Sequence, residues 1–399
     1  MTSLLHSLAE QAGEFIRLRR DIHRHPELAF EERRTAALVA GKLEGWGYAV
    51  ERGIGGTGVV GRLVRGDGRR RLGLRADMDA LPILETSGRE WASARAGVMH
   101  ACGHDGHTAM LLAAARHLAE QGRFDGTLNL VFQPAEEGGG GALRMMEDGL
   151  FERYPCDALF AMHNMPGIAQ GNMVMREGAM MASSDYATIV LSGIGGHGAM
   201  PHKAVDPLVA AASVVMALQT IVSRNIDPLQ PAVVSVGALN AGHANNVIPA
   251  TAQLELTVRA LDRDVRAALE RRIRELVQFQ AQSFGVSADI QWRPGYPVLV
   301  NSAAETAFAR EVALELLGPD RVTLQGAPLT GSEDFAFMLD RVPGSYVLIG
   351  NGDDPAEGAP ACMVHNSGYD FNDGNIAVGS AYWVLLAQRF LTVEATGGH

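Results

Sequence analysis

Short apolar runs alternate with helical patterns of hydrophobic residues over most of the chain. Four apolar runs predict strands that end where polar residues gather: 71–79, 127–137, 157–164 and 345–352. Apolar residues recur at helical spacing between these runs, for example over 107–122. This alternation predicts an α/β fold with a mostly parallel sheet and helices on both faces. Ligands of such sheets bind at the carboxyl ends of the strands.

The pattern changes between residues 182 and 293. Strand and helix patterns follow one another there in the order strand, helix, strand, strand, helix, strand, which is typical of the ferredoxin-like α+β unit. We therefore expect a catalytic domain in two parts, residues 1–181 and 294–399, and an inserted domain over residues 182–293.

Composition narrows the classes of function. Hydrophobic residues make up 47% and charged residues 20% of the 399 residues, as in folded globular proteins. The net charge of -11 argues against nucleic-acid binding, which needs a basic face. The longest apolar run, 207–218, is too short to span a bilayer, and residues 3–27 have the pattern of a helix rather than of a secretory leader. We therefore expect a cytoplasmic protein with no nucleic-acid partner and no membrane partner.

The stretch MHACGHDGHTAMLL, residues 99–112, places one of only three cysteines two positions from a histidine. The spacing of Cys102 and His104 puts them on different faces of a helix, but from a loop both can reach one ion. We therefore expect the helix to begin after them, near Gly106 or His107.

Residue types that ligate transition metals recur at the predicted strand ends and near the end of the chain: Cys102, His104, Glu137, His163 and His365. One thiolate, three imidazoles and a carboxylate suit zinc or a similar transition ion better than magnesium or calcium. Any one of these residues alone is more often structural, and their agreement is what favours a metal site. The pattern gives no partner to the remaining candidates, which we expect to be structural: His23, His25, His100 and His107.

Two segments, 53–58 and 193–198, match the GxGxxG expression of dinucleotide-binding proteins. That mechanism needs glycines that follow a strand and open a helix whose N-terminus receives the pyrophosphate. The first match precedes a strand pattern, and no helical pattern follows the second before Asp206. Neither segment predicts a nucleotide site.

Nine motifs in order resemble one known family: GLRADMDALPI, MHACGHDGHTAMLL, FQPAEEGGGGA, MHNMPG, GGHGAMPHKAVDP, NNVIPA, TVRALD, GSEDF and VHNSGYDFND. The family is that of the dinuclear metallopeptidases, which includes aminoacylases and carboxypeptidases, and the likeness is to its branch of hippurate hydrolases and auxin-conjugate amidohydrolases. The resemblance extends from about residue 19 to about residue 373. It implies two divalent transition-metal ions per subunit, Zn²⁺ or Mn²⁺ first and Co²⁺ or Ni²⁺ as further candidates. It also implies that the inserted domain is a lid or dimerisation domain.

The resemblance assigns roles to individual residues. It implies metal ligation by the five residues already singled out, general acid/base catalysis by Glu136, and orientation of a ligand by Asp79. His197 matches a lid histidine that polarises the scissile carbonyl in the partner subunit's site, and Asn246 and Arg259 match lid residues that bind substrate. A homodimer, or a tetramer of dimers, is implied as well. The chain departs from the branch at Ser367 and Gly374, where proline and glutamate are usual, so the loop with His365 is expected to be less rigid.

The expected activity is hydrolysis of N-acyl amino acids, such as hippurate-like or other N-acyl or N-aroyl conjugates, to a carboxylate and a free amino acid. A metal-activated water would attack the linear amide bond, with Glu136 as general acid/base. Adjacent residues that leave a strand point in different directions, so Glu136 and Glu137 are expected to have separate roles. Two alternatives stay open: a noncatalytic metal-binding dimeric scaffold, and a hydrolase with Cys102 as nucleophile. The sequence does not give the acyl group, the preferred amino acid or the identity of the metals. Cys102 is the residue expected to bridge the two metal ions.

Overall fold

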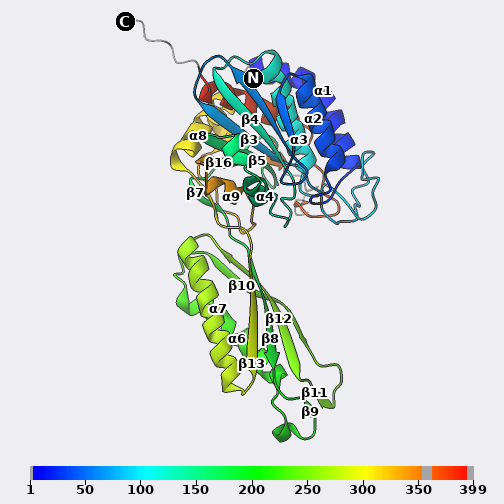
Figure 1. The fold of residues 1–399 in the computed structure, drawn as a ribbon, viewed down its shortest axis with the longest axis vertical. Coiled ribbons are helices and arrows are strands. Elements are labelled where there is room, and N and C mark those ends of the chain that lie inside the picture. Colours follow the sequence, from blue (N-terminus) through cyan, green and yellow to red (C-terminus); the bar gives the residue numbers. More distant parts are fainter. Residues whose placement is uncertain (1–2, 353–361, 393–399) are drawn as a thin grey trace. The chain divides into compact units, whose positions relative to one another are not determined.

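The computed structural model describes residues 3–352 and 362–392. The chain divides into two compact units (Figure 1). The larger unit comprises Met1–Gly178, Val300–Ala327 and Phe337–His399, and the smaller unit comprises Ala179–Leu299 and Pro328–Ala336. The segment 328–336, which the sequence pattern grouped with the catalytic domain, joins the smaller unit because the backbone N–H of Ala182 donates to the carbonyl oxygens of Leu329 and Gly331, at 3.0 and 2.9 Å.

The elements follow the predicted alternation of strands and helices. The helices are α1 (Ser3–Arg24), α2 (Arg33–Gly45), α3 (His104–Glu120), α4 (Gly141–Glu147), α5 (Leu150–Arg153), α6 (Pro207–Asn225), α7 (Arg263–Ser283), α8 (Ala303–Leu317), α9 (Phe335–Leu339) and α10 (Asn375–Phe390). The strands are β1 (Ala49–Ile54), β2 (Gly58–Arg65), β3 (Arg71–Asp77), β4 (Gly126–Gln133), β5 (Ala158–Pro166), β6 (Met173–Val174), β7 (Gly178–Met181), β8 (Asp185–Ser192), β9 (Gly196–His197), β10 (Ala232–Ala241), β11 (Val247–Ile248), β12 (Thr251–Ala260), β13 (Ser287–Pro294), β14 (Leu299–Asn301), β15 (Val322–Thr323) and β16 (Gly344–Gly352).

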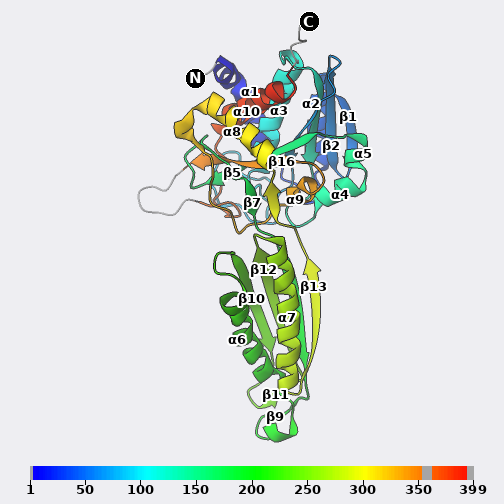
Figure 2. The ribbon, with the colours of Figure 1, turned by 90° about the vertical axis from the view of Figure 1, so that its left-hand side faces the viewer.

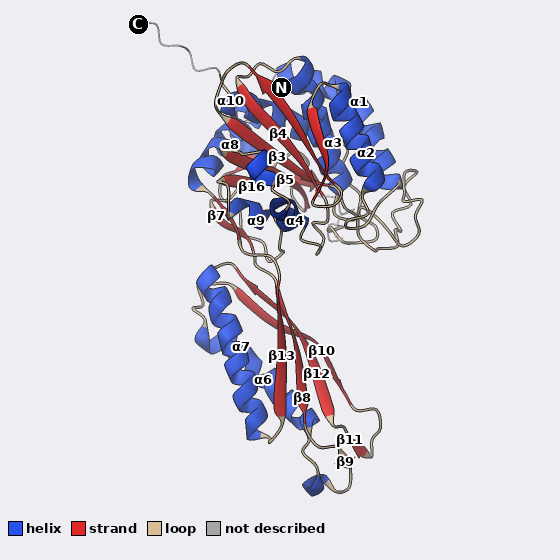
Figure 3. Cartoon of the chain, viewed as in Figure 1, coloured by secondary structure: helices blue, strands red, loops and turns tan. Residues whose placement is uncertain are grey.

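The larger unit is built on an eight-stranded sheet in the order β1-β2-β4-β3-β5-β16-β6-β15. Figure 3 labels its central strands β4, β3, β5 and β16. The neighbours among β4, β3, β5 and β16 are parallel. Strands β1 and β2 are antiparallel to their neighbours at one edge, and β6 is antiparallel to β16 near the other. The predicted mostly parallel α/β fold is therefore confirmed, with its parallel strands at the centre of the sheet.

Helix α3 lies within the main core. It packs against α1, α10 and strand β3, and most of its residues are buried. On β5, Phe160 and Met162 belong to this core, and the alternate residues Leu159 and Ala161 are buried on the other face. Burial on both faces is expected of parallel strands. The packing fixes the N-terminus of α3 and the strand β5, which both bear candidate metal ligands.

The smaller unit has a four-stranded antiparallel sheet in the order β10-β12-β8-β13. Helices α6 and α7 pack against this sheet (Figure 2). Its chain order and strand order are those of the predicted ferredoxin-like unit. On β12, residues alternate between buried and more exposed positions, as expected for a sheet with one face covered by helices. The unit has its own apolar core.

Helix α6 is long and apolar enough to cross a membrane by length and composition alone, which is weak evidence for a membrane span. Its buried residues Ala210, Val214, Leu218 and Ile221 recur every three or four positions and belong to the core of the smaller unit. This is the pattern of an amphipathic helix packed on a sheet.

Candidate active site

A sharp turn before α3 sets the positions of Cys102 and His104. Gly103 has φ of 86°, in the left-handed region, and α3 begins directly after it at His104. A Cβ on Gly103 would lie 2.3 Å from Nδ2 of Asn164, so only glycine fits there. The expectation that the helix begins near Gly106 or His107 was wrong, because the left-handed Gly103 allows the chain to enter the helix at His104.

His163 lies on β5, and its Nε2 is 3.3 Å from Sγ of Cys102. The Nδ1–H of His163 donates to the carbonyl oxygen of Asn164 at 2.6 Å, which leaves the Nε2 lone pair toward the thiol. Burial and the neighbouring His107 hold the pKa of His163 well below its usual value. The imidazole is therefore neutral, which is the form that binds a metal ion.

Asp79 holds His104 and Glu137 together. One oxygen of Asp79 lies 3.3 Å from Nδ1 of His104, and the other accepts the backbone N–H of Glu137 at 2.9 Å. The remaining ring nitrogen of His104, Nε2, is buried and has no hydrogen-bond partner among the described residues. It lies 3.9 Å from Oε1 of Glu137 and 4.0 Å from Oε2 of Glu136.

The surroundings of His104 favour a cation. Burial opposes protonation of the ring, but Asp77, Asp79 and Glu137 outweigh burial and raise the pKa of His104 to about 10. The three carboxylates therefore attract a positive charge to Nε2 of His104, the nitrogen that has no hydrogen-bond partner among the described residues. A divalent ion satisfies both the orphan nitrogen and the carboxylates, so the residues present fit a metal site.

His365 approaches the same group from the segment before α10. Its Nε2 lies 3.1 Å from Oε1 of Glu137, and its backbone N–H donates to the carbonyl oxygen of Ala101 at 2.7 Å. The residue has φ of 65°, and its side chain is 51% exposed. Of the five candidate ligands it is the one whose side chain is most open to solvent.

Candidate ligand atoms form overlapping groups within 4.8 Å of one another: Cys102, His104 and His163; Cys102, Glu137 and His365; and His104, Glu136 and Glu137. The structure thus brings together all five predicted ligands and Glu136. Cys102 belongs to two of these groups, one with His163 and one with His365. Burial, Glu137 and Glu136 raise the pKa of Cys102 well above that of a free thiol. A thiolate at this position therefore needs a nearby cation.

Two residues that sequence reasoning left out of the site, Asp77 and His107, lie directly behind it. Nδ1 of His107 donates to Asp77 at 2.6 Å, and Nε2 accepts the backbone N–H of Asn164 at 3.0 Å. Asp77 also accepts from Arg75 at 2.7 Å, and it lies 3.8 Å from Nε2 of His104. His107 follows His104 by three positions on one helix, a spacing that places two residues on the same face. That spacing could have identified it from the sequence.

The other predicted site residues lie in the smaller unit. His197 on β9 is exposed and pairs with Val247 on β11, and Gly198 donates its N–H to the carbonyl oxygen of Asn246 at 2.8 Å. The backbone N–H of Ala199 donates to Nδ1 of His197 at 3.0 Å, so Nε2 bears the proton and is a hydrogen-bond donor.

Arg259 lies at the far end of β12 from these residues. Thr251 begins β12 close after β11, and Arg259 is eight positions further along the strand, about 26 Å at strand spacing. Its guanidinium donates to Oγ of Ser332 at 3.1 Å. Within one smaller unit, Arg259 is therefore not brought together with His197 and Asn246.

A mostly parallel α/β unit with candidate Cys, His and Glu metal ligands beside a second glutamate is typical of metal-dependent hydrolases. The chain belongs to Peptidase family M20/M25/M40, whose model matches residues 73–389. The family resemblance and the predicted class of enzyme, a hydrolase of amide bonds, are thereby confirmed.

Two curated relatives and a solved structure show how far the similarity extends. The chain is 46% identical to a hippurate hydrolase of Campylobacter jejuni over 98% of this chain and 100% of that protein. It is 38% identical to IAA-amino acid hydrolase ILR1-like 4 of Arabidopsis thaliana over 94% of this chain and 85% of that protein. The YXEP protein of Bacillus subtilis, described as a dinuclear metal binding peptidase, matches with a TM-score of 0.81 and 32% identity, covering 95% of this chain and 98% of that one.

Proposed function

We propose that this protein is a metal-dependent amidohydrolase that cleaves N-acyl amino acids to a carboxylate and a free amino acid. The observation on which this depends is the buried Nε2 of His104, which has no hydrogen-bond partner among the described residues and faces Glu136 and Glu137. The similarity to proteins named hippurate hydrolase and IAA-amino acid hydrolase supports N-acyl amino acids as the substrate class.

In this proposal two divalent ions are held by Cys102, His104, Glu137, His163 and His365. Cys102 would be the residue shared by the ions, because its thiol is grouped with His163 in one set of ligand atoms and with His365 in another. When bound, the ions supply Lewis acidity that lowers the pKa of a water and polarises the amide carbonyl. The thiol and imidazole donors favour Zn²⁺, and Mn²⁺ is the second candidate.

Glu136 moves the proton. It is largely buried beside His104, as a carboxylate that exchanges protons with a confined water should be. It takes a proton from the attacking water and delivers it to the nitrogen of the leaving amino acid. Glu137, in contact with His365, has the different task of holding an ion.

Substrate binding would use residues of two subunits. His197 pairs with Val247 on β11, and β12 begins shortly after β11 at Thr251. Arg259 lies about 26 Å from Thr251 along β12. This length exceeds that of a small N-acyl amino acid, so we expect both residues to act on one substrate only if they come from different copies. We therefore propose a homodimer in which His197 donates its Nε2–H to the carbonyl oxygen of the substrate in the partner's site. Asn246 binds substrate beside it, and Arg259 pairs with the substrate carboxylate. A cytoplasmic location also stays a prediction.

The decisive experiment combines metal removal with a substrate panel. Purified protein, metal-free protein and protein reloaded with Zn²⁺ or Mn²⁺ would be assayed on N-acetyl, N-benzoyl and indole-acetyl amino acids, with the matching amides that lack the carboxylate as controls. We expect activity only with metal and only on substrates with the free carboxylate. Full activity without metal would refute the proposal, and absence of hydrolysis across the panel would favour the scaffold alternative.

A further inference from the structure

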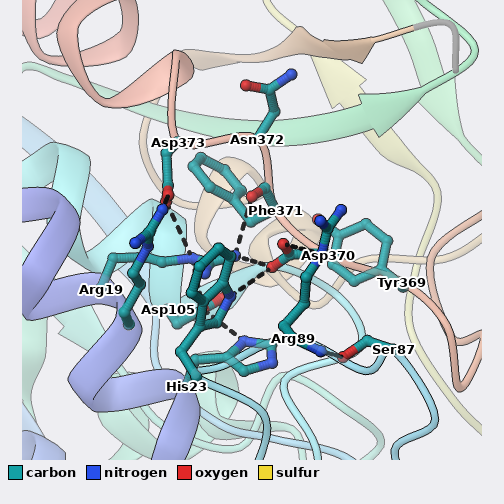
Figure 4. A network of polar contacts seen from close by, with 12 residues as sticks. Arg19, His23, Ser87, Arg89, Asp105, Tyr369, Asp370, Phe371, Asn372 and Asp373 are labelled. Carbon is teal, nitrogen blue, oxygen red and sulfur yellow. Dashed lines mark hydrogen bonds and ion pairs between the residues drawn. The ribbon is translucent and has the colours of Figure 1, made fainter.

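A buried charged network joins helix α1 to the two segments that flank candidate metal ligands (Figure 4). We call it the Arg19 network, and its members are Arg19, Arg20, His23, Asp105, Asp370 and Asp373. Asp105 follows His104 directly on α3, and Asp370 lies five residues after His365.

One guanidinium contacts both segments. Arg19 is fully buried, and its Nε lies 3.0 Å from Oδ2 of Asp105. Its terminal nitrogen forms an ion pair with Asp370 and donates to the carbonyl oxygen of Phe371 at 2.9 Å. Arg19 is therefore a direct link between the residue next to His104 and the segment after His365.

Neighbouring side chains hold the same segment from other directions. Arg20 donates to Asp373 at 2.7 and 2.9 Å and stacks on Trp91, with its guanidinium carbon 3.5 Å from the ring centroid. Nε1 of Trp91 donates to Asp370 at 3.2 Å. Arg19 is fully buried and the two aspartates are largely buried, so a shift of the segment would separate opposite charges that are poorly solvated.

The position of His365 needs such support. Its backbone is in the left-handed region, and half of its side chain is exposed, so few contacts of its own fix it. Ser367, at a position where proline was expected, is held by Thr86, which donates its backbone N–H to the Ser367 carbonyl at 2.7 Å. Tyr369 is a buried anchor on this side, and its hydroxyl donates to Asn164 at 2.5 Å.

We propose that Arg19 is a positioning residue, which fixes the segment 365–373 against the N-terminus of α3 and so holds His365 in the metal centre. The inference rests on the proposed function, because it takes His365 as a metal ligand. The polar partners of Arg19 are Asp105, Asp370, Asp373 and the carbonyl of Phe371, none of which is a candidate ligand. Removal of Arg19 should therefore weaken one of the two ions selectively, as loss of a residue behind a metal ligand typically does.

The test uses three variants, Arg19→Met, Arg19→Lys and Asp370→Asn, with Arg266→Met as the matched control. Arg266 forms a two-bond ion pair with the buried Asp185, at 2.8 and 2.7 Å, in the smaller unit. The metal-free proteins would be titrated with Zn²⁺ against a competing chelator. Hydrogen exchange would be measured on peptides covering residues 362–373.

For Arg19→Met and Asp370→Asn we expect one ion at wild-type affinity and the other weakened by about 10- to 100-fold. Exchange in 362–373 should rise by about tenfold or more, because the segment opens locally without its anchor. Arg19→Lys, which keeps the charge but loses the forked geometry, should recover part of both effects. The control should leave both measurements unchanged. If Arg19→Met does not fold, Arg19→Lys and the isosteric Asp370→Asn decide.

A further variant, His365→Ala, separates this inference from the proposed function. One outcome would overturn the positioning role and leave the ligand set standing. In that outcome His365→Ala loses one ion, whereas the Arg19 and Asp370 variants bind both ions at wild-type affinity and show wild-type hydrogen exchange. If His365→Ala keeps both ions, the ligand set is wrong, and the positioning role fails with it.

Discussion

The Nε2 atom of His163 lies 3.3 Å from Sγ of Cys102. The same contact would suit two ligands of a metal centre or a cysteine nucleophile with its base. The electrostatic surroundings distinguish these cases, because burial and the nearby Glu137 raise the pKa of the thiol and oppose a free thiolate. Cys102 should therefore be inert without a metal ion.

Alkylation tests this directly. In chelated protein at neutral pH we expect iodoacetamide to modify the exposed Cys362 before the buried Cys102, because the reactive species is the thiolate. Cys102→Ser should lose bound metal and activity together, whereas Cys362→Ser should keep both. A chelated enzyme that remains active and is inactivated by modification of Cys102 would instead establish the nucleophile.

Substitution of Glu136 and substitution of Glu137 should affect metal content differently. Glu137→Gln replaces an anionic ligand by a weaker neutral one, so metal content and activity should fall together. Glu136→Gln keeps the shape but cannot accept a proton, so both ions should stay while kcat falls by about 10² to 10⁴. Metal analysis and kcat on the two purified variants are the measurements. The opposite pattern of metal loss would exchange the two roles.

His107 should support the centre without binding an ion. His107→Leu leaves an oxygen of Asp77 and the N–H of Asn164 without their present partner. We expect a loss of about 3 kcal/mol in the free energy of unfolding of the metal-free protein, and weaker Zn²⁺ binding by about tenfold or more. Urea unfolding and chelator competition measure these effects. The exposed His6 gives the control, and equal behaviour of His6→Leu and His107→Leu would contradict the prediction.

Regular periodicity and polar strand ends were sufficient to predict the central strands and the candidate ligands that the structure brings together. The start of α3 was not predictable, because it depends on the left-handed conformation of Gly103. The paired glutamates were expected to point apart, yet both carboxylates lie within about 4 Å of His104 Nε2. They lie in a turn after β4 rather than on the strand, and Ala135 there has φ of 53°.

Long-range ion pairs also could not be predicted from the sequence. Arg19 meets Asp370 across nearly the whole chain, and nothing in local periodicity records such a pairing. The sequence departure at Ser367 predicted a less rigid loop around His365, which stays a prediction. It gave no indication that α1 contacts this segment.

The stability of the fold should depend on the protonation of His23. Burial opposes the charge, but Asp105 and Glu85 outweigh it and raise the pKa of His23 to about 9 from 6.5. A raised pKa stabilises the folded state fully below about pH 6.5, and the contribution is lost as pH rises through about 9. The shift corresponds to at most about 3 kcal/mol. Unfolding free energies of wild type and His23→Gln between pH 6 and 10 should converge with rising pH, and a constant difference would contradict the assignment.

The proposed role of His197 across the dimer predicts complementation between inactive subunits. His197→Ala should keep both ions and lower kcat by about 10² to 10³, the usual cost of losing one such donor. Mixing it with Glu136→Gln should restore activity, because one site in the mixed dimer has an intact Glu136 and an intact His197. Activity before and after subunit exchange is the measurement. Failure to recover activity in verified mixed dimers would place His197 outside the site or in the same subunit.

The larger unit is formed by parts of the chain that lie before and after the smaller unit in the sequence. This arrangement determines the order in which its sheet can be completed during synthesis. Strand β16 pairs with β5, and Leu348 lies opposite His163, yet residues 179–299 leave the ribosome between them. Nearly all of the smaller unit is thus available to fold while β5 still has an open edge and the core still lacks α10. Unpaired strand edges and exposed apolar surface attract other chains. The nascent protein is therefore most prone to aggregate from the moment β5 emerges until α10 is made, and chaperone protection matters most in that interval.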